Sequence, residues 1–172
     1  MKVIVYSIPT VNGLIAKEGE QDYSFISEGD WALYLQALKE AGAFIMGRHT
    51  YEVSLRTGAF PYPCLNVVMT RQKIENKWGD KAMFTGESPK EVLSLLKKKG
   101  FEKVIVTGGK LSASFLKEKL VDEVWIDMMP RVFAKGTKLF DGESFDADLK
   151  LLAVKRSAAN EVQLRYMVAK YH

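Results

Sequence analysis

Three short runs of apolar residues constrain the fold of this chain more than any other feature. They surround positions 44, 67 and 105, and in each run the apolar side chains are continuous rather than alternating with polar ones. This pattern is typical of parallel strands, because helices cover both faces of a parallel sheet. Helices are therefore expected between the runs, and the chain is predicted to be an α/β protein.

Seven apolar runs rich in β-branched residues supply the candidate strands, and most of them are predicted to be strands. The runs cover residues 3–8, 43–46, 65–70, 103–107, 121–129, 149–154 and 162–169. The last two, which are joined across residues 157–161, are expected to form an antiparallel hairpin with a longer loop. The sheet is therefore predicted to be mostly parallel, with an antiparallel C-terminal pair of strands.

Local signals predict helices between these strands. Ser88 can cap a helix, Pro89 suits its first turn, and Glu91 can reach back to the cap. Ser27 followed by Asp30 resembles a second capping box. Helices are predicted over residues 29–39, 89–99 and 111–119. Strands that alternate with helices in this way indicate an α/β domain.

The length of the chain fits one domain. Its 172 residues can bury roughly 70% of their unfolded surface around a single core, and no repeat or linker interrupts them, so residues 1–172 are predicted to form one domain. Cys64 is the one cysteine and cannot form an internal disulfide, and Met1 leads into a strand pattern without the features of a secretory signal. A cytoplasmic protein is expected, with apolar runs too short to cross a membrane.

The charge of the chain is mildly positive. The net charge is +4 and the sequence isoelectric point is about 9.0, with lysines scattered except at residues 97–99. That triplet is expected to be the solvated end of a helix, where the helix dipole favours cations. No nucleic-acid partner is expected, whereas the positive balance suits an anionic small molecule such as a phosphorylated cofactor.

Three predicted strand ends carry residues that suit phosphate groups. Gly47 and Arg48 follow one apolar run, Thr70 and Arg71 end another, and residues 108–110 join a third run to a helix through two glycines. Glycine lets the backbone approach a ligand, and the N–H groups of a helix N-terminus bind anions. Each site alone could be a tight connection or a solvated charge. Because ligands of open α/β sheets bind beyond the carboxyl ends of the strands, the three together predict a polyanion such as a dinucleotide.

The same segments resemble a known family. The motifs IMGRHTYE at 45–52, NVVMT at 66–70 and VTGG at 106–109 resemble the ordered motifs of the dihydrofolate reductase superfamily. A closer resemblance, to the C-terminal reductase domain of bifunctional riboflavin biosynthesis deaminase/reductase enzymes, is carried by residues 108–116, LVDE at 120–123 and GTKLF at 136–140. This resemblance implies a dihydrofolate reductase-like three-layer α/β fold, with a mostly parallel central sheet, helices on both faces and a C-terminal antiparallel hairpin.

The resemblance also implies an NADPH-dependent reductase that transfers hydride from nicotinamide to a heterocyclic or ribosylaminopyrimidine substrate. Around the adenosine 2′-phosphate it implies Arg48, Thr70 and Arg71. Around the pyrophosphate it implies Gly47, His49 and Thr50, although His49 could instead be an ordinary surface ring. The second phosphate loop would comprise Thr107, Gly108, Gly109, Lys110 and Leu111, with a cis peptide in the double glycine as in most relatives. Nicotinamide would be bordered by Ile15 and Ala16, and substrate would contact Ser7, Pro9 and Tyr34.

Reduction of a C=N or C=O bond requires a proton as well as a hydride, so an acid or an ordered water is expected near the accepting atom. Asp30 is the first candidate, because folate reductases use a carboxylate on the first helix, but it could also only complete a helix cap. Asp127 is the second candidate, at a position where folate reductases usually have a threonine. If the two carboxylates approached each other, repulsion would raise one pKa. Otherwise Asp127 is structural or faces outward.

Two departures from the resemblance disfavour folate as the substrate. Folate enzymes hold the glutamate tail with an arginine where this chain has Cys64, and residues 22–25 replace their tryptophan-rich loop. A true dihydrofolate reductase and a non-catalytic NADP-binding module remain the alternatives to a reductase of the 5-amino-6-(5-phosphoribosylamino)uracil reductase type. No residues have metal-ligand spacing, and a homodimer is expected from the relatives alone.

Overall fold

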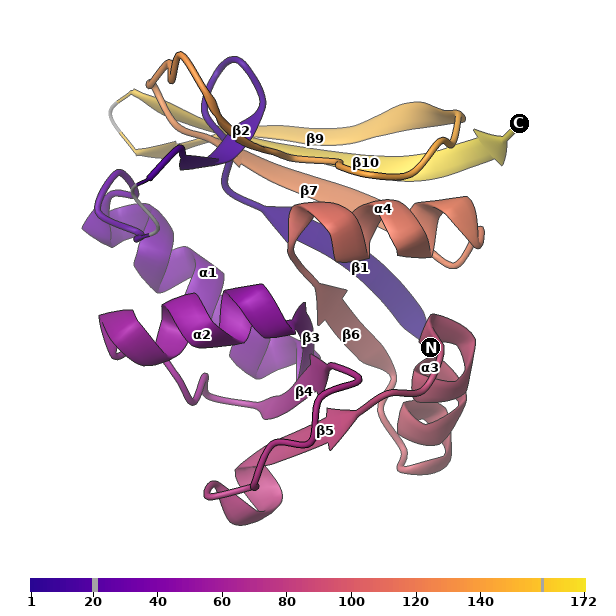
Figure 1. The fold of residues 1–172 in the computed structure, drawn as a ribbon. Coiled ribbons are helices and arrows are strands. Elements are labelled where there is room, and N and C mark those ends of the chain that lie inside the picture. The colour runs from indigo at the N-terminus through magenta and orange to yellow at the C-terminus, as the bar shows by residue number, and fades with distance from the viewer. Residues whose placement is uncertain (20–21, 159) are drawn as a thin grey trace.

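The computed structural model describes residues 1–19, 22–158 and 160–172. Its helices are α1 (Glu28–Ala41), α2 (Arg48–Thr57), α3 (Pro89–Lys98) and α4 (Gly109–Lys117), with a short 3-10 helix η1 (Gly79–Lys81). Its strands are β1 (Lys2–Ser7), β2 (Leu14–Lys17), β3 (Ala43–Gly47), β4 (Leu65–Met69), β5 (Ala82–Thr85), β6 (Lys103–Val106), β7 (Glu123–Met128), β8 (Gly136–Lys138), β9 (Ala147–Ala158) and β10 (Glu161–Tyr171). Figure 1 shows this arrangement.

A single large sheet runs through the described part of the chain. It has eight strands in the order β5-β4-β3-β6-β1-β7-β10-β9. Neighbouring strands from β5 to β7 are parallel, whereas β10 is antiparallel to β7 and β9 is antiparallel to β10. The prediction of a mostly parallel sheet with a C-terminal antiparallel hairpin is therefore confirmed. The longer loop expected across residues 157–161 is wrong, because β9 continues to Ala158 and β10 begins at Glu161, and these two residues pair. A separate antiparallel ribbon is formed by β2 and β8.

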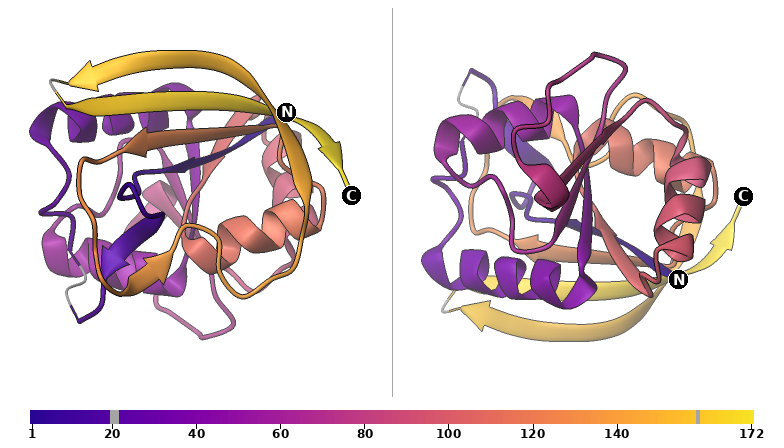
Figure 2. Two further views of the ribbon diagram at one scale, coloured as in Figure 1. Left: turned by 90° about the horizontal axis from the view of Figure 1, so that it is seen from above. Right: turned by 90° about the horizontal axis from the view of Figure 1, so that it is seen from below.

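Helices cover both faces of the sheet, which gives the predicted three layers. One core contains Leu38 of α1 and Tyr51 of α2, packed on side chains such as Ile4 of β1. The opposite core contains Leu96 of α3 and Phe115 of α4. Figure 2 shows these helix pairs on opposite sides of the sheet. Because each central strand is buried on both faces, its apolar run is continuous, as the sequence indicated. In the described part of the chain, no helix is long and apolar enough to cross a membrane.

The helix caps follow the local sequence closely. At α3, the Ser88 hydroxyl accepts a hydrogen bond from the Glu91 backbone N–H, and the Glu91 carboxylate accepts one from the Ser88 backbone. At α1, the Ser27 hydroxyl accepts a hydrogen bond from the Asp30 backbone N–H. The Asp30 carboxylate does not return a bond to Ser27, so this box is half formed.

Sequence reasoning missed one helix and misplaced the start of another. Residues 48–57 were expected to begin with a phosphate-binding turn, but they form α2, whose cap is Gly47 without a side-chain hydrogen bond. With no capping side chain and no acidic residue in its first turn, α2 lacks the usual start signals. Likewise α4 begins at Gly109, two residues before the predicted start at 111, because Gly108 is its cap.

Candidate functional site

A cavity of about 530 Å³ lies at the carboxyl ends of the central strands. Ser7 at the end of β1, Gly47 at the end of β3, and Thr107 after β6 all contribute to its lining. The ribbon of β2 and β8 borders the same space through Ile15, Ala16 and Thr137. The cavity is therefore where ligands of open α/β sheets bind, beyond the strands and between the loops that follow them.

Most of the predicted cofactor residues line this cavity. They are Ile15, Ala16, Gly47, His49, Thr50, Thr107, Gly108, Gly109, Lys110 and Leu111. They come from the β2 ribbon, from the carboxyl ends of β3 and β6, and from the first turns of α2 and α4. Two helix N-termini therefore open onto one cavity, and the unpaired N–H groups of such termini favour anions. Asp141 also lines the cavity and contacts the Gly109 end of α4.

The other predicted cofactor residues lie outside the cavity lining. The Arg48 guanidinium pairs with the Glu52 carboxylate at 2.7 Å on the exposed surface of α2, Arg71 is exposed, and the Thr70 hydroxyl accepts a hydrogen bond from the Gln72 backbone. These three residues nevertheless follow the carboxyl ends of two adjacent strands, because Gly47 and Met69 are register partners in β3 and β4. Their role at a 2′-phosphate stays a prediction.

The Gly108–Gly109 turn packs too closely for larger residues. A Cβ on Gly109 would lie 2.4 Å from the Lys138 carbonyl oxygen, and one on Gly108 would lie 3.2 Å from the Thr50 hydroxyl. The expected cis peptide between the two glycines is wrong: in the described residues, the cis bond is Phe60–Pro61. A φ of 99° at Gly108 makes the turn instead, in the left-handed region that glycine tolerates.

The α1 end of the cavity is aromatic. Tyr23, Trp31 and Tyr34 form a row in which neighbouring ring centroids lie 5.2 Å and 5.8 Å apart and the planes differ by 27° and 23°. Phe44 and Tyr62, whose rings meet edge to face at 4.9 Å, also line the cavity. Among these rings only Tyr34 was predicted from the sequence. The spacing of Trp31 and Tyr34 on one helical face was an available signal, whereas Tyr23, Phe44 and Tyr62 gave none.

A buried serine organises two of these rings. The Ser54 hydroxyl of α2 donates to the Thr50 carbonyl at 2.7 Å. It also lies 3.0 Å from the Tyr23 hydroxyl and 2.8 Å from the Tyr62 hydroxyl. Since the single Ser54 proton is used on Thr50, both tyrosines donate to Ser54, and their oxygens keep lone pairs for a ligand.

Two of the three predicted substrate residues line the cavity. Ser7 and Tyr34 line the cavity, whereas Pro9 is buried beside it and its carbonyl accepts a hydrogen bond from the Met129 N–H. The Ser7 hydroxyl is buried and has no hydrogen-bond partner among the described residues. A ligand that reached Ser7 could therefore satisfy this group.

The predicted proton donors lie behind the cavity rather than on its lining. Asp127 is fully buried on β7, not facing outward, and it accepts a hydrogen bond from the Tyr6 hydroxyl. Gln163 of β10 in turn donates to the Tyr6 oxygen at 3.1 Å. Burial raises the pKa of Asp127 to about 6, against the hydrogen bond from Tyr6 and the nearby Gln163 amide, and the nearby charge of Asp30 adds to the rise.

Asp30 is fully buried at the start of α1. Neither carboxylate oxygen has a partner of hydrogen-bonding geometry among the described residues. Burial raises its pKa; the nearby Ser157 hydroxyl opposes the rise, and the Glu161 carboxylate adds to it. Because the charge of Asp30 acts on Asp127, the arrangement is consistent with the expected approach of the two carboxylates. Their role as proton donors stays a prediction.

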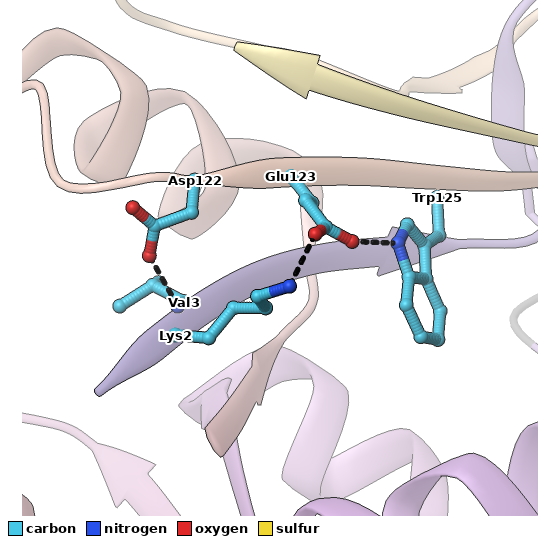
Figure 3. Close-up of polar contacts among 5 residues, drawn as sticks. All are labelled: Lys2, Val3, Asp122, Glu123 and Trp125. Atoms are coloured by element: carbon cyan, nitrogen blue, oxygen red, sulfur yellow. Dashed lines mark hydrogen bonds and ion pairs between the residues drawn. The ribbon is translucent and has the colours of Figure 1, made fainter. Parts of the chain in front are cut away.

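The LVDE motif has a structural position at the amino end of β7, opposite the carboxyl ends of the strands where the cavity lies. Figure 3 shows Glu123 bound by the Lys2 ammonium at 2.6 Å and by the Trp125 indole N–H at 2.8 Å. Burial would raise the pKa of Glu123, but the two hydrogen bonds and the charges of Lys2 and Arg165 together outweigh burial and hold the pKa below its ordinary value. The Asp122 carboxylate accepts a hydrogen bond from the Val3 backbone N–H at 2.7 Å. The motif therefore ties β7 to β1 and fixes their register.

The fold and its cavity define the class of the protein, which is that of dihydrofolate reductase-like reductase domains. The chain belongs to the RibD C-terminal domain family, whose profile matches residues 1–163. It is 30% identical over 173 residues to the uncharacterized protein YwjB of Bacillus subtilis (strain 168), and the alignment covers 98% of each chain.

Solved structures share the fold. A protein of Shewanella sp. PV-4 assigned to riboflavin biosynthesis superposes with a TM-score of 0.83 at 23% identity, covering 99% of this chain and 100% of that one. A pyrimidine reductase-like protein of Corynebacterium diphtheriae gives 0.74 at 16% identity, covering 98% and 92%. The Thermotoga maritima diaminohydroxyphosphoribosylaminopyrimidine deaminase/5-amino-6-(5-phosphoribosylamino)uracil reductase gives 0.78 at 17% identity, with 98% of this chain matching 56% of that one.

Proposed function

We propose that this protein is an NADPH-dependent reductase that transfers hydride to a heterocyclic substrate. The observation that carries the proposal is the composition of the cavity. One end joins the N-termini of α2 and α4, which suits phosphates, and the other end is aromatic, which suits a flat ring. The match to the RibD C-terminal domain family supports the same reaction class.

The residues present fit a dinucleotide. A Cβ on Gly47 would meet no atom within 4 Å, so the backbone there borders open space in the cavity. The pyrophosphate would lie against Thr50 and Gly108, with the Lys110 ammonium as a counter-charge. Nicotinamide, which supplies the hydride when bound, would lie under Ile15 and Ala16 of the β2 ribbon.

The preference for NADPH over NADH is assigned to the exposed edge beside the cavity. Arg48, Thr70 and Arg71 follow the neighbouring strands β3 and β4 and would hold the 2′-phosphate there. Arginine suits this role because its planar fork can contact phosphate through two hydrogen bonds. The Glu52 carboxylate, which now pairs with Arg48, would share that arginine with the phosphate.

Asp30 and Asp127 are proposed as the proton reservoir of the reaction. Burial raises the pKa of both carboxyls, and that of Asp127 lies near neutrality at about 6. Tyr6, which donates to Asp127, contacts Tyr34 with ring centroids 4.8 Å apart, and Tyr34 lines the cavity. Because a ring contact carries no proton, transfer from these carboxyls to the substrate would require an ordered water that bridges the wall by hydrogen bonds.

Binding and turnover test the proposal in sequence. Fluorescence titration should detect binding of NADPH, and the absence of binding at millimolar concentration would refute the proposal that the protein is an NADPH-dependent enzyme. Arg48→Ala should weaken the binding of NADPH far more than that of NADH. Arg56→Ala, about 12 Å away along α2, should change the affinity for neither cofactor. Equal losses for both cofactors in Arg48→Ala would contradict the 2′-phosphate assignment.

Substrate assays separate the alternatives. NADPH oxidation with the deaminated riboflavin precursor, 5-amino-6-(5-phosphoribosylamino)uracil, and with its relatives tests the pyrimidine reductase. Oxidation with dihydrofolate tests the folate reductase, which Cys64 disfavours, since a thiol cannot replace the bidentate arginine. Binding of NADPH without turnover of any heterocycle would support the non-catalytic module.

A homodimer is also proposed, because the edge strand β9 exposes an apolar row. Leu149, Leu151 and Val154 are 42%, 51% and 58% exposed. The unpaired backbone groups of this edge can pair with the same edge of a second copy across a two-fold axis, and the second copy would then cover part of the apolar row. Light scattering after size exclusion should give twice the chain mass, and Leu151→Lys should reduce it; a monomer at all concentrations would refute the dimer.

A further inference from the structure

The two ends of the cavity differ in charge. Of the described residues that line it, His49 and Lys110 are the ones whose side chains can carry a positive charge. Both belong to the first turns of α2 and α4, where the cofactor phosphates are proposed. The α1 end is lined by Tyr23, Trp31 and Tyr34 and by apolar neighbours, without a lysine or arginine among the described residues.

Among the described residues at the aromatic end, the side chain that is charged near neutral pH is an acid. Asp22 lines the cavity there, and the Ser24 hydroxyl and backbone N–H donate to its carboxylate at 2.7 Å and 3.0 Å. These hydrogen bonds lower the pKa of Asp22, so the group is negative near neutral pH. At the opposite end Asp141 is offset by Lys110 and two helix N-termini. No comparable described group accompanies Asp22 within the cavity, so a substrate phosphate would meet a like charge.

The aromatic row suits stacking. Trp31 stacks on Tyr23 and on Tyr34 with ring planes 27° and 23° apart, so a flat ligand would contact the outer faces and the edges of this row. Phe44 and Tyr62 lie edge to face on the same cavity. Aromatic side chains contact flat rings over a large area and, with few rotatable bonds, hold them at little entropic cost. The tyrosine oxygens that point at Ser54 keep lone pairs, which could accept hydrogen bonds from ring N–H groups.

We infer that the substrate of this site is a flat heteroaromatic compound without a phosphate group, bound against Tyr23, Trp31 and Tyr34. The inference rests on the proposed reductase function and narrows its substrate class. It separates this chain from the Thermotoga maritima enzyme, whose name specifies a phosphoribosyl compound.

A smaller cavity offers the competing position for a phosphate. It has a volume of about 310 Å³ and is lined by Lys17, Arg131 and Asp22, together with Ser24, Phe25 and neighbouring residues. Asp22 lines both cavities. A phosphate that extended from the aromatic end toward Arg131 would therefore pass this carboxylate. An experiment must therefore distinguish a substrate whose phosphate binds in the smaller cavity from a substrate that carries no phosphate.

Matched pairs of compounds that differ only in a phosphate provide the test. With NADPH-saturated protein, binding is measured by quenching of tryptophan fluorescence for riboflavin against its 5′-phosphate. NADPH oxidation is measured for 5-amino-6-ribosylaminouracil against its 5′-phosphate. We expect the phosphate-free member of each pair to bind or react several-fold better, since two like charges about 4 Å apart in water cost roughly a fivefold change in affinity.

Every result decides the inference. Equal or better use of the phosphorylated member in either pair overturns it, and so does the absence of binding and turnover for all four compounds. Failure of the reductase proposal is read separately, from the NADPH titration that precedes these assays. If NADPH binds and the phosphorylated member is preferred, the reductase stands and the substrate inference falls.

Variants locate the binding surface. Trp31→Leu should raise the dissociation constant of riboflavin about tenfold without changing that of NADPH, and Trp31→Phe, which keeps a ring, should retain most of the affinity. Trp78→Leu, at an indole that packs on Phe60 outside the cavity lining, is the matched control and should leave riboflavin affinity unchanged. Arg131→Ala should not alter the preference within either pair; a selective loss of the phosphorylated members would place the phosphate in the smaller cavity and overturn the inference.

Discussion

Asp127→Asn should remove part of the pH dependence of stability. Burial raises the pKa of Asp127 from its ordinary value of 3.8 to about 6. The folded protein therefore binds this proton more tightly than the unfolded chain does. The contribution of the protonated Asp127 to the unfolding free energy is fully present below pH about 4. It is lost as the pH rises to about 6, because ionising Asp127 costs more free energy in the folded state than in the unfolded chain.

The size of the effect follows from the same difference. Each pKa unit corresponds to 1.36 kcal/mol, so the wild type should lose about 3 kcal/mol of unfolding free energy from this group between pH about 4 and about 7. In a chain of this length, that corresponds to roughly 6–12 °C in the thermal midpoint. Asparagine cannot ionise, yet its carbonyl can accept the Tyr6 hydrogen bond. Any fixed cost of the amide is the same at both pH values and cancels from the comparison.

The assay is thermal unfolding of both proteins, followed by circular dichroism across this pH range. The difference between wild type and Asp127→Asn should change in favour of the variant as the pH rises. Asp30→Asn should reduce the pH dependence of the wild type, because the Asp30 charge contributes to the raised pKa of Asp127. Asp80→Asn, at an exposed position of η1, is the control. Parallel pH profiles for wild type and Asp127→Asn would refute the reasoning.

Three further changes test the site, a cap and the core. Gly109→Ala should weaken NADPH binding at least about tenfold and lower the thermal midpoint, because its Cβ would lie 2.4 Å from a backbone carbonyl oxygen. Gly29→Ala, whose Cβ would meet no atom within 4 Å, should instead stabilise α1 by up to about 1 kcal/mol. Equal effects of the two substitutions would contradict the packing argument. Ser88→Ala should lower the unfolding free energy by about 1 kcal/mol in urea titrations through loss of the α3 cap, and an unchanged midpoint would count against it. Leu96→Ala, at a fully buried position, should cost about 2–5 kcal/mol in the same titrations, more than Leu95→Ala at 39% exposure.

Much of the fold could be predicted because its signals are local. The continuous apolar runs identify β3, β4 and β6 as buried parallel strands, and the Ser88 cap identifies the start of α3. Helix α2 escaped prediction because a glycine cap gives no side-chain signal and because its first turn carries no acid. The short strands β2, β5 and β8 also escaped, since three or four residues are too few to show a period.

The candidate site was predicted unevenly for a related reason. Glycines and small polar residues at strand ends are visible in the sequence, and most of those proposed for the cofactor line the cavity. The partner of Arg48 was not visible, and its ion pair with Glu52 depends on α2 being a helix, since residues four apart meet only on a helical face.

The sequence by itself determined the longer strands, the serine caps of α1 and α3, the glycine turn and the acids that could titrate, because these depend on backbone torsions and residue chemistry within a few positions. Only the tertiary structure decided that Tyr23, Phe44 and Tyr62 share one cavity and that Asp127 is buried beneath it. The order of strands in the sheet sets which distant side chains meet. Desolvation, which raises the pKa of Asp127, exists only once the surrounding elements have excluded water.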